Sequence, residues 1–391
     1  MEKICYVIWK FKSPKNFVNM GGSETQLLKW IKQLEKQDKK ITIITRKTEN
    51  DEKFESSSEN IEIYRINTTK VKYLSMLLFT IGLFFMFIKL IRKEKFDIIH
   101  VPLPDVYLSV IYLIRLIFKI PVITTAAGDE LFPQIKKGLW YVDRVIVKYL
   151  MLKSDGLHTL NNITYELGEV LNYKKNKLFL ISNGVEIPIK SKNYEKLTNK
   201  IVYIGAMRHF PEKQKREIKN LEFLLESFDQ LRKNKPNLRL LMVGDGNYRI
   251  KLEEKTKKLN LQNHVIFTGY QTDIVKYHME ADIFVNASLK EGMPNTVIEA
   301  MGSGIFVLCS NIHAHRHIIK NGITGVLFDN TNRNDFIRKV NEFYNNPENY
   351  IEIAKNGRRY IEDYFAIEVI VNQILVMYKK VLYYFINDNY Y

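Results

Sequence analysis

The sequence is poor in the residues that mark secreted, metal-binding or low-complexity chains. Of its 391 residues only two are cysteines, Cys5 and Cys309, and they lie far apart. This spacing forms neither a disulfide framework nor a pattern of metal ligands. Only ten prolines and eighteen glycines are present, which excludes a low-complexity chain. We therefore expect a globular protein of a reducing compartment, the cytoplasm.

The N-terminus lacks the pattern of a secretory signal. The apolar run in MEKICYVIWKFKSP is short and is not followed by a small-residue cleavage site. We expect this run to be the first strand of a sheet.

Positive charge is the feature in excess. Lysine and arginine number 59 against 43 aspartates and glutamates, a net charge of +16. Residues 65–153 carry fourteen Lys and Arg against six Asp and Glu, so half of the excess lies in under a quarter of the chain. The sequence contains no recognised nucleic-acid module or basic–aromatic repeat, so we expect no nucleic-acid partner.

Two apolar stretches, 73–88 and 106–120, lie within this basic region, and four basic residues follow the first between Lys89 and Lys95. Sixteen residues are fewer than the ~20 that a spanning helix needs. One interpretation is a buried helix of the first domain with a solvated basic end. The interpretation that we favour is an in-plane amphipathic face held on anionic lipid. We thus expect peripheral association with the inner face of the cell membrane.

Strand-like runs alternate with helix-like runs along the chain, which is the pattern of parallel α/β layers. A polar stretch at 190–200, KSKNYEKLTNK, is predicted to be a linker, after which the pattern restarts. Strands are predicted at KICYVIW, ITIIT, IEIYRI, DIIHV, PVITT, GLHTL and KLFLIS before the linker, and at KIVYIGAM, LRLLMVG, VIFTG, ADIFVNAS and GIFVLCS after it.

The length suits two domains of ordinary size. We predict two Rossmann-like, doubly wound parallel-sheet domains, 1–190 and 191–365, facing across a cleft. Ligands of such sheets bind at the carboxyl ends of the strands. The amphipathic helix within 366–391 is expected to return to the first domain; docking of a partner or of lipid is the alternative.

A first strand-end turn, Gly21-Gly22-Ser23-Glu24, follows the N-terminal strand. Ser23 and Gln26 have the spacing of a capping box, which predicts a helix start. Glycines let the backbone come close to a ligand, and the N–H groups of a helix start favour an anion. A plain turn and cap is the alternative.

The second domain opens in a similar way. Gly205 and Arg208 follow its first strand, and Lys219 precedes the predicted helix LEFLLESF. Two cations at this place would neutralise a diphosphate and replace a metal ion, so no metal is predicted. Gly244 begins another strand-end turn, with a backbone role near a base or ribose. Other basic residues of the stretch remain alternatives to Lys219: Lys213, Lys215 and Arg216.

The run LKEGMPNTVIEAMGSG (289–304) follows the strand ADIFVNAS and carries two carboxylates, Glu291 and Glu299. If Glu291 ends a loop and Asn295 caps a helix, both carboxylates can face the same place as the N–H groups of residues 292–296. Carboxylates accept hydrogen bonds from vicinal hydroxyls, which suits a ribose and a transferred sugar. Taken alone, the stretch could equally be a surface glutamate and a glutamate in a capping turn.

The order of these motifs resembles glycosyltransferase family 4, and the resemblance covers nearly the whole chain. Its most specific part is the stretch EGMPNTVIEAMGSG in its strand–loop–helix setting. The resemblance implies a GT-B fold and retaining sugar transfer. The matching motifs are Gly21-Gly22-Ser23-Glu24, Ser182-Asn183-Gly184-Val185, Gly205 with Arg208 and Lys219, Gly244-Asp245-Gly246, and Glu291 to Glu299.

The resemblance also implies roles for single residues. Arg208 and Lys219 correspond to the pair that grips the donor diphosphate. Glu299 corresponds to the carboxylate that binds the ribose, and Glu291 to the one that contacts the donor sugar. Gly22 corresponds to the first-domain glycine that closes on the diphosphate. The loop whose backbone holds the sugar and phosphate is matched by Gly292, Met293, Pro294 and Asn295, with Thr296 following.

One departure from the family concerns the turn after PVITT. Many members carry a histidine before the glycine there, whereas this chain has Ala126-Ala127-Gly128-Asp129-Glu130. Asp129 is the candidate to take over contacts to the sugar or acceptor. None of His100, His158 and His313 occupies that position, and each is interpreted as an ordinary polar residue.

The predicted function is transfer of a hexose-type sugar from a nucleoside-diphosphate sugar, UDP- in preference to GDP-, with no cofactor and no metal. The acceptor is expected to be lipid-linked or a saccharide, in cell-surface polysaccharide or glycolipid synthesis. A nucleotide-sugar epimerase would instead turn over the donor without an acceptor. A non-catalytic binding protein of the same fold would bind nucleotide without releasing it from any donor.

Overall fold

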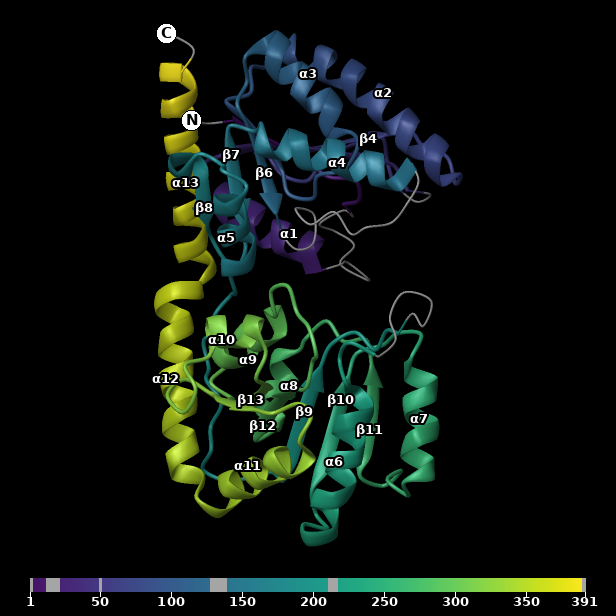
Figure 1. The fold of residues 1–391 in the computed structure, drawn as a ribbon, viewed down its shortest axis with the longest axis vertical. Helices are drawn as coiled ribbons and strands as arrows, with labels where there is room; N and C mark the ends of the chain where they lie inside the picture. The colour runs from purple at the N-terminus through teal and green to yellow at the C-terminus, as the bar shows by residue number, and fades with distance from the viewer. Residues whose placement is uncertain (1–2, 12–21, 49–50, 127–138, 210–216, 389–391) are drawn as a thin grey trace. The chain divides into compact units, whose positions relative to one another are not determined.

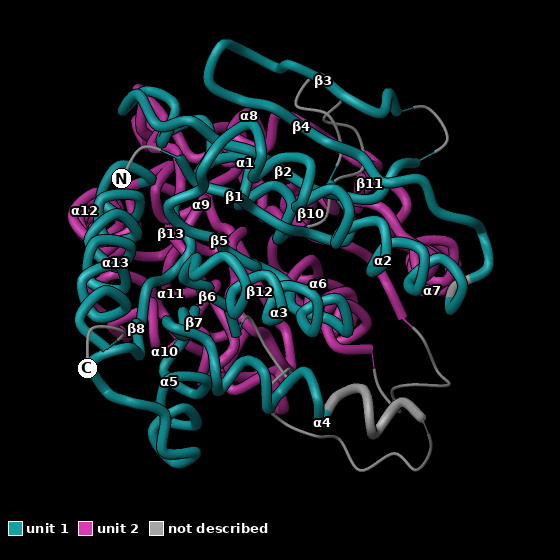
Figure 2. Tube along the Cα trace, turned by 90° about the horizontal axis from the view of Figure 1, so that it is seen from above, with its two compact units in different colours: residues 1–184, 367–391 teal, residues 185–366 magenta. Residues whose placement is uncertain are grey.

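The computed structural model describes residues 3–11, 22–48, 51–126, 139–209 and 217–388 (Figure 1). The chain forms two compact units (Figure 2). Unit 1 comprises Met1–Gly184 with Ile367–Tyr391, and unit 2 comprises Val185–Ala366. Each unit is built on one largely parallel sheet with helices on both faces, so the predicted pair of α/β domains is confirmed.

The sheet of unit 1 has eight strands in the order β3-β4-β2-β1-β5-β6-β7-β8. All neighbours are parallel except β3, which pairs antiparallel with β4 at one edge. The strands are β1 (Lys3–Val7), β2 (Lys40–Arg46), β3 (Phe54–Ser56), β4 (Ile61–Ile66), β5 (Ile98–Val101), β6 (Val122–Ala126), β7 (Gly156–Thr159) and β8 (Leu178–Leu180).

Strand alternation divides the core of unit 1 into two layers, because successive side chains of a strand point to opposite faces. In β1, Ile4 and Tyr6 join one buried cluster, whereas Cys5 and Val7 join the other. Helices α1 (Gly22–Glu35) and α13 (Ile367–Asp388) supply the first layer. The second layer comes from α2 (Lys72–Ile91), α3 (Leu108–Phe118), α4 (Leu139–Leu152) and α5 (Asn162–Val170).

The sheet of unit 2 has six parallel strands in the order β11-β10-β9-β12-β13-β14. They are β9 (Lys200–Ile204), β10 (Arg239–Val243), β11 (Val265–Gly269), β12 (Ile283–Asn286), β13 (Phe306–Ser310) and β14 (Val326–Phe328). Its helices are α6 (Leu221–Asn234), α7 (Arg249–Lys258), α8 (Val275–Glu280), α9 (Asn295–Gly302), α10 (His313–Ile318), α11 (Arg333–Asn345) and α12 (Pro347–Phe365). The two strands that the sequence did not predict, β3 and β14, have three residues each, too few for a periodic pattern.

The polar stretch 190–200 belongs to unit 2 and is not a free linker. Lys192 Nζ donates to Met279 O at 2.8 Å, and Thr198 N donates to Asp282 Oδ1 at 2.9 Å. Asp282 is fully buried. The boundary between the units lies at Gly184, earlier than the predicted 190. Val185, the first residue of unit 2, donates its N–H to Phe365 O at 2.9 Å, a contact with a distant part of the chain that leaves no local pattern.

The apolar stretch 73–88 forms most of α2, a helix with two different faces. Phe79, Leu83 and Phe87 are fully buried in the core, whereas Tyr73 and Phe85 are exposed. By length and composition alone, α2 and α13 are the two described helices that could cross a membrane. Helices that lie in the core of a soluble domain meet the same criterion, and one face of each helix is buried in this way.

Candidate functional site

Two strand-end turns of unit 2 are in direct backbone contact. Gly205 follows β9 and Gly244 follows β10, and Gly205 N donates to Val243 O at 2.9 Å. Gly244 has a φ of +135°, and a Cβ at this position would lie 2.0 Å from Gly205 O. Only glycine fits such a backbone and such a close approach. The two predicted glycines therefore shape the carboxyl end of the sheet.

Arg208 lies just beyond the first of these turns. Its neighbour Met207 is fully buried, and Met207 N donates to Asp245 O at 3.0 Å, which joins the two turns again. The Arg208 side chain itself is exposed. It makes no ion pair with any residue of the described ranges, so its guanidinium is available to an anion.

Lys219 is positioned by a buried carboxylate at the start of α6. Glu217 is 8% exposed, and its two oxygens accept hydrogen bonds from Lys219 N at 2.7 Å and Leu221 N at 2.8 Å. Burial raises the pKa of Glu217, and the two backbone N–H groups oppose this shift. Carboxylates stabilise the first turn of a helix in this manner. Lys213, Lys215 and Arg216, the alternatives to Lys219, lie outside the described residues.

Lys219 and Glu291 form an ion pair, with 2.6 Å between Lys219 Nζ and Glu291 Oε1. Ser288 Oγ donates to the same oxygen at 2.7 Å. The side chains of Lys219 and Glu291 are 28% and 12% exposed, so the pair is accessible from one side. Two residues that lie 72 positions apart in the sequence are thus brought to one place.

The loops that carry this pair are tied together by further hydrogen bonds. Leu289 N donates to Ile218 O at 2.7 Å. Asn220 Nδ2 donates to Asn330 O, and Asn330 Nδ2 donates to Ser288 O, each at 3.2 Å. The sequence analysis missed Ser288 and Asn330. No local motif marks them, because Ser288 follows β12, Asn330 follows β14, and the two meet only in the folded sheet.

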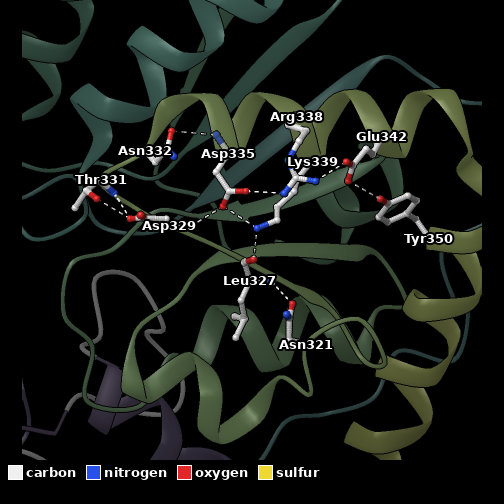
Figure 3. A network of polar contacts seen from close by, with 10 residues as sticks. All are labelled: Asn321, Leu327, Asp329, Thr331, Asn332, Asp335, Arg338, Lys339, Glu342 and Tyr350. Carbon is white, nitrogen blue, oxygen red and sulfur yellow. Dashed lines mark hydrogen bonds and ion pairs between the residues drawn. The ribbon is translucent and has the colours of Figure 1, made fainter.

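Asn330 lies in a turn between β14 and α11 that a polar network holds in place (Figure 3). Asp335 accepts hydrogen bonds from Asp329 N at 2.9 Å and from Lys339 Nζ at 2.7 Å. Lys339 also donates to Leu327 O at 2.8 Å, and the Asn332 side chain caps α11 by accepting from Asp335 N. The network therefore positions the turn from which the Asn330 amide reaches the site.

The helix α9 begins differently from the prediction. Its cap is Pro294, which offers no side-chain hydrogen bond, and Asn295 is the first helical residue. Asn295 is therefore not the cap, because Pro294 already has the non-helical conformation. Glu299 lies one residue later in the helix than expected, as the fifth residue of α9. No acidic residue lies in the first turn, so the positive end of the helix dipole is not neutralised there by its own side chains.

His315 is a buried residue beneath the site that the sequence analysis did not single out. Its Nδ1 lies 2.7 Å from Ser310 O, and its Nε2 has no hydrogen-bond partner within the described part of the chain. Burial lowers the pKa of His315; the Ser310 carbonyl and Glu291 oppose this shift, and Lys219 adds to it. Ser310 Oγ donates to Ser288 O at 2.6 Å, so His315 connects to Glu291 through two serines.

Of the remaining predicted residues, Gly292 and Met293 lie in the loop between Glu291 and Pro294, and Thr296 is the second residue of α9. In unit 1, α1 begins at Gly22, which is exposed. The helix start that the spacing of Ser23 and Gln26 predicts is confirmed, since α1 begins at this turn. Ser23 is not its cap, however, because Gly22 is already helical, and the Gln26 side chain is buried. Asp129 lies outside the described residues.

Two family models match the chain. The model described as "Glycosyltransferase Family 4" matches residues 20–187, and the model described as "Glycosyl transferases group 1" matches residues 190–360.

Curated relatives match the chain over more than half of its length. An uncharacterized glycosyltransferase of Methanocaldococcus jannaschii is 31% identical over 57% of this chain, which spans only 58% of the relative. The UDP-Gal:alpha-D-GlcNAc-diphosphoundecaprenol alpha-1,3-galactosyltransferase of Escherichia coli is 25% identical, with coverage of 74% of this chain and 77% of the relative.

The fold is shared with a solved structure over nearly the whole chain. The sucrose-phosphate synthase of Thermosynechococcus elongatus superposes with a TM-score of 0.78, covering 98% of this chain and 100% of that one. Their sequence identity is 18%, so this likeness concerns the fold alone.

Proposed function

We propose that this chain, which belongs to the glycosyltransferases of the family 4 type with the GT-B fold, transfers a hexose from a UDP-sugar with retention at the anomeric carbon. The acceptor is a lipid-linked or saccharide hydroxyl, and the product belongs to a cell-surface polysaccharide or glycolipid. No cofactor or metal takes part in this proposal.

The observation that carries the proposal is the pairing of Lys219 with Glu291 near the end of the unit 2 sheet. Lys219 and the exposed Arg208 supply two positive charges to the diphosphate. These charges stabilise the diphosphate as a leaving group. Both donors to Glu291 reach Oε1, so Oε2 can accept a hydrogen bond from a hydroxyl of the donor sugar. Glu299, the fifth residue of α9, is assigned to the ribose.

The proposed step is a front-face substitution. The bond between the anomeric carbon and the diphosphate oxygen breaks, and the acceptor oxygen bonds to the same carbon on the same face. The proton of the acceptor hydroxyl passes to the departing phosphate oxygen. Because Glu291 is held by Lys219 and Ser288, it orients the sugar and is not the nucleophile. The protein thus contributes orientation and charge stabilisation.

We assign contact with the acceptor and the membrane to the second helical layer of unit 1. Exposed apolar residues gather on three neighbouring helices, α2, α3 and α4 (Figure 1), within the basic region 65–153. Apolar area and positive charge together favour the surface of an anionic membrane. The name of the E. coli relative includes diphosphoundecaprenol, a lipid carrier. We therefore place this protein on the cytoplasmic face of the membrane with a lipid-linked acceptor.

A donor panel with one matched pair of variants tests the proposal. Purified protein is given UDP- and GDP-sugars with and without a saccharide or lipid-linked acceptor, and nucleotide release and product configuration are measured. Arg208→Ala should lower kcat by about a hundredfold, since a cation on a leaving group contributes a few kcal/mol to the transition state. Lys233→Ala, which removes an exposed lysine of α6, serves as the control. Unchanged turnover of Arg208→Ala, or an inverted product, would refute the mechanism.

A further inference from the structure

Unit 1 contains a cavity of about 680 Å³ at the carboxyl ends of β1, β2 and β4. Its walls include Trp9 after β1, Arg46 and Lys47 at the end of β2, and the segment 67–70 that leads into α2. Ligands of parallel α/β sheets bind at this edge, and ligand pockets have about this volume. None of the described residues predicted for the donor site lines it.

The cavity is suited to an anion. Arg46, Lys47 and Lys70 line it, and Asp105 is the one carboxylate among the described residues of its lining; Asp105 Oδ1 accepts a hydrogen bond from Val106 N. The Arg46 guanidinium lies 4.9 Å from the centre of the Trp9 ring, which holds its plane fixed. Planar guanidinium and lysine ammonium groups together are the usual ligands of a phosphate.

Two buried polar atoms at the cavity have no hydrogen-bond partner among the residues that the structure describes. Ser75 is 1% exposed and lines the cavity, and its Oγ is unpartnered, as is Nε of Arg46. Buried polar atoms are nearly always hydrogen-bonded, so these two point to a ligand that supplies oxygens. Ser75 belongs to the start of α2, where Val71 provides no side-chain cap and no acidic residue lies in the first turn. The N–H groups of that turn favour an anion.

An apolar stripe runs along α2 from the same end. Its residues are exposed by 37–64%, and at 3.6 residues per turn they share one side of the helix, opposite the buried Phe79 and Leu83. The stripe begins beside Ser75 and continues for more than three turns. It comprises Tyr73, Leu74, Leu77, Leu78, Ile81 and Phe85.

We infer that the cavity binds the phosphate or diphosphate group of a lipid-linked acceptor, whose apolar chain lies along the stripe of α2. The cations, Ser75 Oγ and the start of α2 hold the phosphate oxygens. The stripe holds the hydrocarbon next to the membrane. This inference deepens the proposed function by naming the acceptor class, and it rests on that function only for the sugar transfer itself.

Binding without a donor tests the inference separately from catalysis. The full chain is sedimented with phosphatidylcholine vesicles that contain a polyprenyl diphosphate, and binding of inorganic pyrophosphate is measured by calorimetry. Replacing Arg46, Lys47 and Lys70 by Gln should weaken binding of both probes, by about tenfold for each lost charge-assisted contact. The control carries the same charge change on exposed lysines outside the cavity, Lys36, Lys174 and Lys175 to Gln, and should bind as the unchanged chain does.

The stripe has its own variant, Leu77→Ser with Phe85→Ser. It should lose about tenfold or more in vesicle binding by removal of exposed apolar area, and it should bind pyrophosphate unchanged. Since Arg46 contacts Trp9, the Lys47→Gln, Lys70→Gln double variant is measured as well, together with its thermal unfolding. It should lose about tenfold in binding for each of its two replaced charges, with an unchanged Tm.

Several results would overturn the inference. Equal losses in the cavity variant and its charge-matched control would mean general attraction to anions. Equal affinity for pyrophosphate and for the polyprenyl diphosphate would mean that a free phosphate compound, and not a lipid, is the ligand. Hydrolysis of the donor sugar without an acceptor is measured in parallel. If the unchanged chain hydrolyses no donor, the proposed function is contradicted, but the binding measurements still show whether the cavity binds the lipid diphosphate.

Discussion

At the scale of single residues, Glu291 depends on neighbours that its own motif does not contain. Lys219 and Ser288 donate to one of its oxygens, and Ser288 O in turn accepts from Ser310 and Asn330. Ser288 is fully buried, so water cannot replace the hydrogen bonds that it makes. In our proposal it is a positioning residue that keeps Glu291 directed at the donor sugar.

Ser288→Ala should lower kcat by about tenfold, which is the value of one hydrogen bond to a charged group. The apparent KM for the donor should change less, because the diphosphate contacts of Arg208 remain. Steady-state kinetics with the preferred UDP-sugar checks this split.

The control for this prediction is Ser227→Ala in α6, another fully buried serine whose Oγ bonds to Phe223 O at 2.7 Å. Both variants remove one buried serine Oγ from unit 2. If both reduce kcat equally, Ser288 has only a structural role.

At the scale of elements, α3 is held to the sheet of unit 1 by a nearly buried ion pair. Arg115 near the end of α3 donates to both oxygens of Asp155, at 2.7 and 2.6 Å, and Val122 N donates to the same carboxylate at 2.9 Å. The Asp155 side chain is 4% exposed. This anchor explains how a helix with exposed apolar residues such as Leu116 stays in place.

Asp155→Ala should lower the free energy of unfolding by about 3 kcal/mol, because it leaves a guanidinium and a backbone N–H without their partner. Urea unfolding followed by circular dichroism measures this change.

The matched control is Glu169→Ala, which removes an exposed pair with Lys175 at 3.7 Å. We expect it to stay within about 0.5 kcal/mol of the unchanged chain. A loss of similar size in both variants would contradict the role of the Arg115–Asp155 pair.

At the scale of the whole molecule, buried histidines occur in the cores of both units. His100 and His158 share Thr125 Oγ1 at 2.8 and 3.1 Å, and His100 Nδ1 lies 2.7 Å from Tyr378 Oη of α13. Burial lowers the pKa of His158 from 6.5 to about 4, and that of His278 in unit 2 to about 3. The folded chain therefore keeps these rings neutral at pH values where the unfolded chain binds protons.

Stability should consequently fall as the pH decreases from 6.5 towards 4. In that window the unfolded state binds more protons than the folded state, so the free energy of unfolding decreases with decreasing pH. His158 by itself accounts for about 3 kcal/mol over the window. Urea unfolding at a series of pH values measures the slope, and His158→Gln should make it shallower. A slope that is the same in the variant would contradict the neutral state of His158.

The sequence by itself determined the features that local patterns encode. Buried strands and their order of appearance follow from short apolar runs between turns, and twelve of the fourteen strands in the described residues were predicted in this way. The family resemblance followed from motifs that lie within a few consecutive residues, above all residues 291–299. The candidates Arg208, Lys219 and Glu291 were named because strand-end turns mark the functional edge of a parallel sheet.

Only the tertiary structure decided which distant residues meet. The sheet brings the ends of β12, β13 and β14 together, so Ser288, Ser310 and Asn330 support Glu291 although they lie far apart in the sequence. The stretch 73–88 is apolar on all sides, and periodicity cannot tell which face is buried when both are apolar. Tertiary packing determines which face is buried. One face of α2 packs into the core, and the other face is exposed and begins next to the cavity that Ser75 lines.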